Sequence, residues 1–132
     1  MKKETREKLA SLEREVSSEK GEFSLFGLFL REDSQDEDKW DLLVAAPWLE
    51  ADKKEALAYL AQKIQKHLEP DEILSISRIV VLEKGNPNLE NIHKAVKVKQ
   101  KWVELKENNL FGLPITQACI STSSAVNPTI SK

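Results

Sequence analysis

The stretch "DKWDLLVAAPWLEADKKEALAYL", residues 38–60, changes its hydrophobic period once, and this change predicts a strand followed by a helix. In "WDLLVAA", residues 40–46, the side chains alternate between two faces, which is typical of a β-strand. Pro47 has no N–H and biases the residue before it toward extended geometry, so we expect the strand to end there. From residue 52 to 68 the apolar side chains recur at helical spacing, which predicts an amphipathic helix.

The segments on either side of this stretch predict six further elements. Their apolar residues show the same two periods, and Gly, Pro and Asn separate them. They are a helix at 3–20, a strand at 22–32, a strand at 72–83, a helix that begins after Asn86, and two strands within 99–123 around a turn near Asn108 and Asn109.

The predicted order is therefore α-β-β-α-β-α-β-β, which indicates an α+β fold. Strands joined through helices favour parallel crossovers, and short connections favour hairpins, so we expect a mixed sheet of about five strands with helices packed on it. Residues 1–121 are predicted to form a single domain that begins with the amino-terminal helix 1–20. The segment 122–132 has few large apolar side chains and is predicted to be a flexible tail.

The charge balance argues against several classes of partner. A net charge of −2 and a pI of about 5.8 argue against a nucleic-acid partner, because neutralising phosphates requires a clustered positive face. Residues 1–20 are charged throughout and lack the apolar core of a signal peptide, and no apolar run is long enough to span a bilayer as a helix. We therefore expect no membrane partner and a cytoplasmic location.

The single cysteine, Cys119, excludes an intramolecular disulfide and a cysteine metal site. It lies in a predicted strand and neither histidine is near it in sequence, so we interpret it as a small buried hydrophobe. We also expect no cofactor and no bound metal.

Two acidic positions are the candidates for chemistry. Asp41 lies inside a predicted strand, and an acid-x-Lys triplet follows at Asp52, Lys53 and Lys54. The structural interpretation of Asp52 is an N-cap, because Glu55 follows it by three residues as in a capping box. Asp41 would then lie at a strand end facing water, or would pair with Arg78 or Lys39 if it is partly buried.

The order of helix, strand, acid-bearing strand and acid-x-Lys triplet resembles the metal-dependent nucleases of the restriction-endonuclease-like superfamily, over about the first half of the chain. The resemblance implies that Asp41 and Asp52 would hold a divalent ion and that Lys54 would position or activate the attacking water. In that family the acid-x-Lys residues lie on a strand, whereas here they open a predicted helix, where positions two apart do not face each other. The nuclease is therefore the alternative function.

The leading hypothesis is a non-catalytic domain that acts by assembling with itself, as a homodimer or larger homo-oligomer, or with another protein. The strand at 22–32 is apolar on both faces, and the helix at 3–20 has an apolar stripe too narrow to define its own core. The predicted interface residues are Leu9, Leu12 and Val16 on that helix and Trp48 at the exit of the second strand, since Trp is enriched in interfaces.

A third hypothesis places a small-ligand site at the carboxyl ends of the parallel strands, near Pro47 and Gly85. It depends on the frequency with which open α/β sheets bind ligands at that edge.

Overall fold

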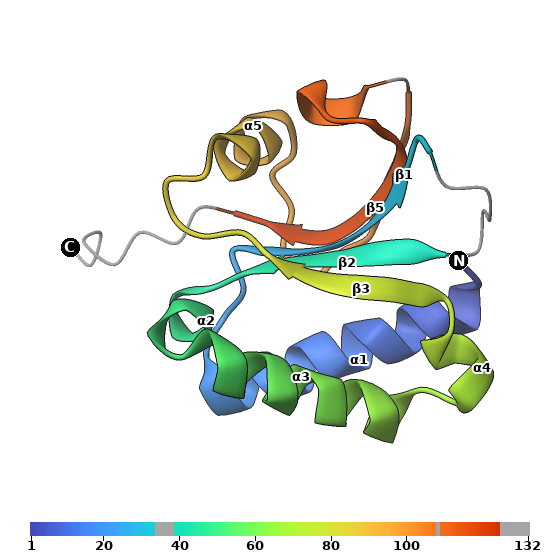
Figure 1. The fold of residues 1–132 in the computed structure, drawn as a ribbon, viewed down its shortest axis with the longest axis vertical. Helices are drawn as coiled ribbons and strands as arrows, with labels where there is room; N and C mark the ends of the chain where they lie inside the picture. The colour runs from blue at the N-terminus through green and yellow to red at the C-terminus, as the bar shows by residue number, and fades with distance from the viewer. Residues whose placement is uncertain (34–38, 108, 125–132) are drawn as a thin grey trace.

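The computed structural model describes residues 1–33, 39–107 and 109–124. These residues form one α+β body, a five-stranded mixed sheet with helices on both faces (Figure 1). In chain order the elements are α1 (Lys3–Lys20), β1 (Leu25–Arg31), β2 (Trp40–Ala45), α2 (Pro47–Ala51), α3 (Lys53–His67), α4 (Pro70–Ile73), β3 (Ile76–Val81), α5 (Pro87–Ala95), β4 (Val103–Lys106), the 3-10 turn η1 (Leu110–Gly112) and β5 (Ile115–Ser123). The predicted fold class and order of the main elements are confirmed.

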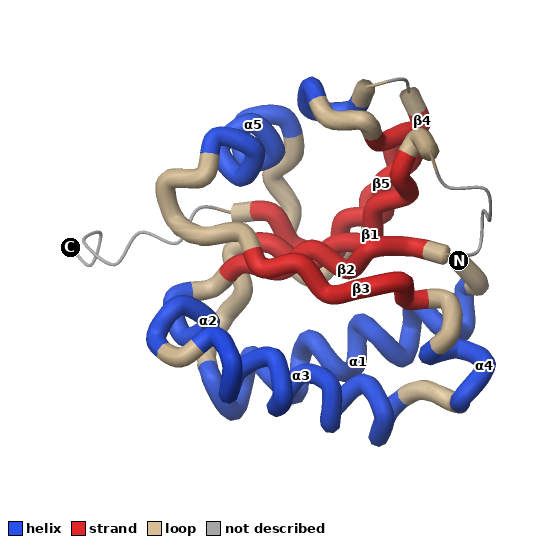
Figure 2. The backbone as a smooth tube through the Cα atoms, in the orientation of Figure 1, coloured by secondary structure: helices blue, strands red, loops and turns tan. Residues whose placement is uncertain are grey.

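The strands lie in the order β3-β2-β1-β5-β4, so β3 and β4 are the two edges of the sheet (Figure 2). β1 pairs antiparallel with β2 and β5, and β4 pairs antiparallel with β5. β2 and β3 are parallel, and α2, α3 and α4 form the crossover that a parallel pair requires.

The sheet has an apolar layer on each face. One layer joins it to α1 and α3 and includes Leu9, Phe26 and Leu60. The other joins it to α5 and includes Phe29 and Ile92. All six residues of β2 are buried, as are all those of β1 before its last residue, which explains why the sequence of β1 is apolar on both faces.

Helix α1 packs against the sheet of its own chain, which corrects the predicted interface role of Leu9, Leu12 and Val16. These three side chains are fully buried in the core and are not available to a partner. The buried face of α1 is wider than its apolar residues alone indicated, because Thr5 and Glu13 are buried on the same face. A buried polar side chain is tolerated when it is hydrogen-bonded, and both of these are.

Two prolines begin helices that the sequence analysis did not predict. Pro47 is the first residue of α2, and Pro70, which lies between the predicted helix at 52–68 and the predicted strand at 72–83, is the first residue of α4. The first helical position suits proline because its missing N–H would have no intrahelical acceptor. Since α4 occupies 70–73, the third strand begins later than predicted, at Ile76.

The carboxyl end of the described chain differs from the predicted tail. β5 continues to Ser123, and both Thr122 and Ser123 are buried. The rest of the predicted tail, 125–132, lies outside the described residues. Asn109 has a positive φ of 53°, as its position in the predicted turn requires, while Asn108 lies outside the described residues. In the part of the chain that the structure describes, no helix has the length and apolar character that crossing a bilayer demands.

Candidate functional site

Asp52 is the N-cap of α3. Its carboxylate accepts a hydrogen bond from the backbone N–H of Glu55 at 3.1 Å, as the sequence analysis predicted. A cap of this kind stabilises a helix by about 1 kcal/mol. Asp52 and Lys54 are both exposed to solvent at the start of the helix.

Asp41 is buried on the face of the sheet opposite to α3. Its Oδ2 accepts from Nε of Arg78 at 3.1 Å, the partner that the sequence suggested, and lies 3.7 Å from Nε of Arg31. Arg31 and Arg78 lie on β1 and β3, the strands on either side of Asp41. The second oxygen, Oδ1, is buried without a hydrogen-bond partner among the described residues.

The structure does not bring Asp41, Asp52 and Lys54 together. Asp41 is near the start of β2, whereas Asp52 follows α2 at the far end of that strand, and the sheet lies between them. Five residues of strand alone span about 16 Å. Among the residues described, no three or more His, Cys, Asp or Glu side chains are grouped closely enough to hold a metal ion. The arrangement that the nuclease resemblance requires is therefore not present.

Trp48, the fourth predicted interface residue, is half-buried against its own chain. Its indole Nε1 donates to the backbone carbonyl of Gly21 at 3.1 Å. Its ring makes edge contacts with Phe23 and Tyr59, at centroid distances of 5.6 and 6.1 Å. The indole therefore ties α2 to the end of α1 and to α3.

The segments near Pro47 and Gly85, between which a small ligand was proposed to bind, contact each other directly. The Glu50 carboxylate accepts from the backbone N–H of Lys84 at 3.0 Å, and Lys53 forms an ion pair with Glu83. The Glu50 carboxylate, the Lys84 N–H and the Lys53 and Glu83 side chains are therefore paired with one another rather than free to contact a ligand. These contacts weigh against the ligand hypothesis at this edge of the sheet.

Cys119 is buried on β5, as predicted. Burial raises the pKa of its thiol, and the nearby Arg6 guanidinium only partly opposes this effect. A thiol that is buried and protonated at neutral pH is a poor nucleophile.

Glu13 is the buried carboxyl group that the sequence analysis missed. Its Oε1 accepts from the Ser121 hydroxyl at 2.5 Å, and its Oε2 accepts from the Thr122 hydroxyl. Both hydroxyls face α1 because the register of β5 shifts here: Thr122 is opposite Phe26 while Ile120 is opposite Gly27, so Ser121 is an extra residue.

Burial raises the pKa of Glu13, and the two hydroxyl hydrogen bonds partly oppose the shift. The side chain is only 1% exposed, so no substrate reaches it from solvent. We interpret Glu13 as an anchor between α1 and β5 rather than as a catalytic acid. The signal in the sequence was its position four residues after Leu9, on the same helical face.

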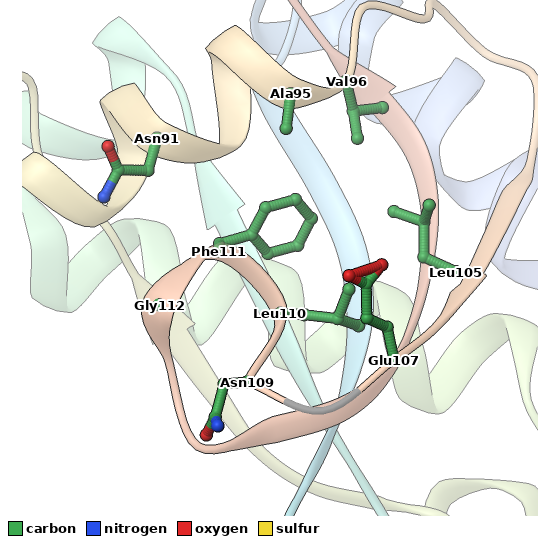
Figure 3. A pocket seen from close by; sticks show the side chains of 9 residues that line it. All are labelled: Asn91, Ala95, Val96, Leu105, Glu107, Asn109, Leu110, Phe111 and Gly112. Atoms are coloured by element: carbon green, nitrogen blue, oxygen red, sulfur yellow. The ribbon is translucent and has the colours of Figure 1, made fainter.

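A groove of about 420 Å³ lies between α5, the end of β4 and η1 (Figure 3). Its walls are mainly apolar, and Asn91, Glu107 and Asn109 supply the polar groups. Phe111 adopts a left-handed φ of 58° and packs against Phe29 at a centroid distance of 6.0 Å. The described residues that line it include no Ser, Thr, Cys or His, and Glu107 is the one ionisable side chain among them, so the groove offers a place to bind with few groups for catalysis.

A second groove, of about 380 Å³, runs along the open edge of the sheet between β3 and α3. Its lining is almost entirely apolar and is formed by Leu57, Ala61, Ile64, Gln65, Ile73, Ile76, Arg78 and Ile79. Leu74 adjoins it and, among the residues described, is the one large apolar side chain that stays mostly in solvent, at 65% exposure. We name this region, together with the edge of β3, the β3–α3 surface. It is formed by Leu57, Ala61, Ile73, Leu74, Ile76, Ile79 and Val81, and by Val80, whose side chain packs on the opposite face of the sheet.

The backbone of β3 is open along the same edge. None of the described strands pairs with its outer side. All five apolar side chains of Ile73, Ile76, Ile79, Val80 and Val81 are only half-buried. An edge strand of this kind is a template for another strand, and an apolar patch beside it indicates a site where another protein docks.

Compared with protein-family models, with curated proteins and with solved structures, the chain matches none. The function is therefore argued from the geometry alone.

Proposed function

We propose that this domain acts by protein–protein assembly rather than by catalysis, and that another chain docks on its β3–α3 surface. The observation that carries the proposal is the coincidence of an open strand edge with an apolar groove on one side of the molecule. Strand addition supplies main-chain hydrogen bonds along the edge, and the groove supplies pockets for side chains.

The apolar side chains of this surface supply the driving force. Burying a fully exposed Leu side chain stabilises a complex by about 1.5–3 kcal/mol, and Leu74 retains most of that exposure. The half-buried Ile and Val side chains of β3 add smaller amounts. The only charge on β3, Arg78, is paired with Asp41, so docking here does not have to bury an unpaired charge of the strand.

The chemistry of the other candidates supports the same function. The potential nucleophile Cys119 and the carboxyl group of Glu13 are buried. The residues proposed for metal chemistry, Asp41 and Asp52, are separated by the sheet. Among the described residues, the β3–α3 surface is the one that combines an open strand edge with an exposed apolar side chain and an apolar groove.

Site-specific photo-crosslinking tests the proposal without assuming the partner. A photoreactive phenylalanine analogue replaces Leu74 in one variant and Lys106, which is exposed on β4, in the control. After irradiation of cells of the protein's natural source, we expect an adduct with a second polypeptide chain from position 74 and none from position 106. The absence of an adduct at position 74, or equal yields at both positions, would contradict the proposal.

A further inference from the structure

We infer that the partner at the β3–α3 surface is a second copy of this chain, joined by antiparallel pairing of β3 with β3 about a two-fold axis at Val80. This inference rests on the proposed function and names its partner. The two sheets would become one continuous sheet, and the helices on the α3 side of each copy would form one continuous layer.

The backbone of β3 is suited to pairing with itself. Leu82 donates its N–H to the Val44 carbonyl at 2.9 Å, and Val44 is in register with Val81. Because alternate residues of a strand direct their N–H and C=O to the same side, Val81 and Ile79 direct theirs to the open edge. Pairing Ile79 of each copy with Val81 of the other satisfies these groups in two reciprocal pairs.

The side chains of β3 near this two-fold axis would contact the same kinds of side chain in the second copy. The pairing places Val80 opposite its own copy on one face and Ile79 opposite Val81 on the other, so every central contact is between β-branched apolar residues. Arg78 does not face its own copy, because it lies two residues from the axis, and its charge is paired with Asp41. A two-fold interface needs a self-complementary patch of this kind.

Helix α3 extends the self-complementary surface beyond the edge of β3. Figure 1 shows α3 lying beside β3 on one face of the sheet, and Leu57, Ala61 and Gln65 form an uncharged stripe at intervals of four residues toward the groove. The two-fold axis brings the two stripes toward each other on the same face of the joined sheet. The two grooves then close into a single apolar layer. Apart from Arg78, whose charge is paired with Asp41, the side chains that line the groove are uncharged, so two copies can meet there without like-charge repulsion.

Disulfide trapping tests the geometry in the purified protein. Val80→Cys is made in a Cys119→Ala background, with Lys106→Cys in the same background as the control. Directly opposed residues of a non-hydrogen-bonded antiparallel pair have Cα atoms about 4.5 Å apart, within the range that a disulfide spans. Under mild oxidation we expect Val80→Cys to form a covalent dimer and Lys106→Cys to remain monomeric.

Sedimentation velocity over a wide concentration range measures the assembly itself. We expect the wild-type chain to form a reversible dimer and Ala61→Glu to weaken it at least about tenfold, because the second copy would bury the new carboxylate in the apolar groove without a partner. Gln62→Glu, at an exposed position of the same helix that does not line the groove, is the matched control and should leave the dimer unchanged.

The outcomes separate the inference from the proposed function. A chain that stays monomeric at every concentration, while position 74 still crosslinks to a different protein in cells, overturns the second copy and leaves assembly in place. A dimer that Val80→Cys does not trap overturns the antiparallel β3 geometry. A dimer that is trapped at Val80 and weakened by Ala61→Glu supports both.

Discussion

The two edges of the sheet, β3 and β4, differ in the properties that control strand pairing (Figure 2). β3 has six residues, four of them Ile or Val, and one charge. β4 has four residues, and its alternate positions Glu104 and Lys106 are charged and exposed. Short length and outward charges are the devices by which natural proteins keep an edge from pairing. The sequence protects β4 in this way and leaves β3 open.

The helices beside the two edges differ in the same sense. On the β4 side, α1 is fixed by polar contacts: Arg6 Nη1 lies 2.5 Å from the Glu104 carboxylate, and Glu13 binds the hydroxyls of Ser121 and Thr122. On the β3 side, α3 leaves the apolar groove. One side of the domain is therefore closed by polar contacts within the chain, while the other has apolar surface that a partner can cover.

The largest effect that we expect concerns the polar anchor on the β4 side. Glu13→Ala leaves the hydroxyls of Ser121 and Thr122 buried without an acceptor and opens a cavity, so the free energy of unfolding should fall by about 2–4 kcal/mol. Glu13→Gln keeps a carbonyl acceptor and should lower the free energy of unfolding less than Glu13→Ala does. Urea unfolding followed by tryptophan fluorescence measures both.

The matched control is Arg14→Ala, the exposed neighbour on α1, which should change the free energy of unfolding by less than about 0.5 kcal/mol. If Glu13→Ala lowered the free energy of unfolding no more than Arg14→Ala does, the anchor would not stabilise the β4 side. The contrast between the two sides would then have no energetic basis.

A smaller effect concerns pH. Burial raises the pKa of Glu13, so the folded state holds this proton more tightly than the unfolded state does. The contribution to stability is fully present below the ordinary pKa of 4.5 and is lost as pH rises through the raised value. The stability of the wild-type chain relative to Glu13→Gln should therefore decrease as pH rises above 4.5. Urea unfolding of both proteins from pH 4 to 8 measures this difference, and a constant or rising difference would contradict it.

The smallest effect on stability comes from removing the protection of β4. Glu104→Val with Lys106→Val deletes an exposed ion pair, which is worth about 0–1 kcal/mol, and adds two β-branched residues to an edge strand. The free energy of unfolding should change by less than about 1 kcal/mol. The chain should nevertheless gain a second pairing edge, and sedimentation velocity should detect species larger than the wild-type assembly.

The matched control for this variant is Glu90→Val with Lys94→Val, two exposed positions one helical turn apart on α5. It adds the same apolar groups away from any strand edge and should leave the assembly unchanged. An identical increase in size for both double variants would show that general stickiness, rather than an open strand, controls association.

Local patterns predicted most of the elements correctly. The period of two in 40–46 and the helical spacing after Asp52 gave β2 and α3, because both depend only on neighbours within a few residues. The Asp52 cap was also predicted from the residue types. Arg78 was one of the alternatives for Asp41, beside Lys39 and a position facing water, and the structure selects it. The helices that begin at Pro47 and Pro70 were missed because these two prolines were interpreted only as the ends of the elements before them.

The burial of helix α1 could not be predicted from the sequence. Leu9, Leu12 and Val16 were predicted to meet a partner because only apolar residues were counted toward the buried face of α1. Glu13 completes that face, but it can be buried only because a register shift in β5, more than a hundred residues later, turns two consecutive hydroxyls toward it. No local pattern contains that information.

The sequence by itself determined which segments become strands and helices, where caps and prolines end them, and which strands are apolar enough for the middle of a sheet. Only the tertiary structure decided that β3 and β4 are the edges and that α1 belongs to the core. Secondary structure follows from periodicity and backbone preference over a few residues. Edge position and burial depend on which distant segments come to lie side by side, and they set which surface of this domain is left for another molecule.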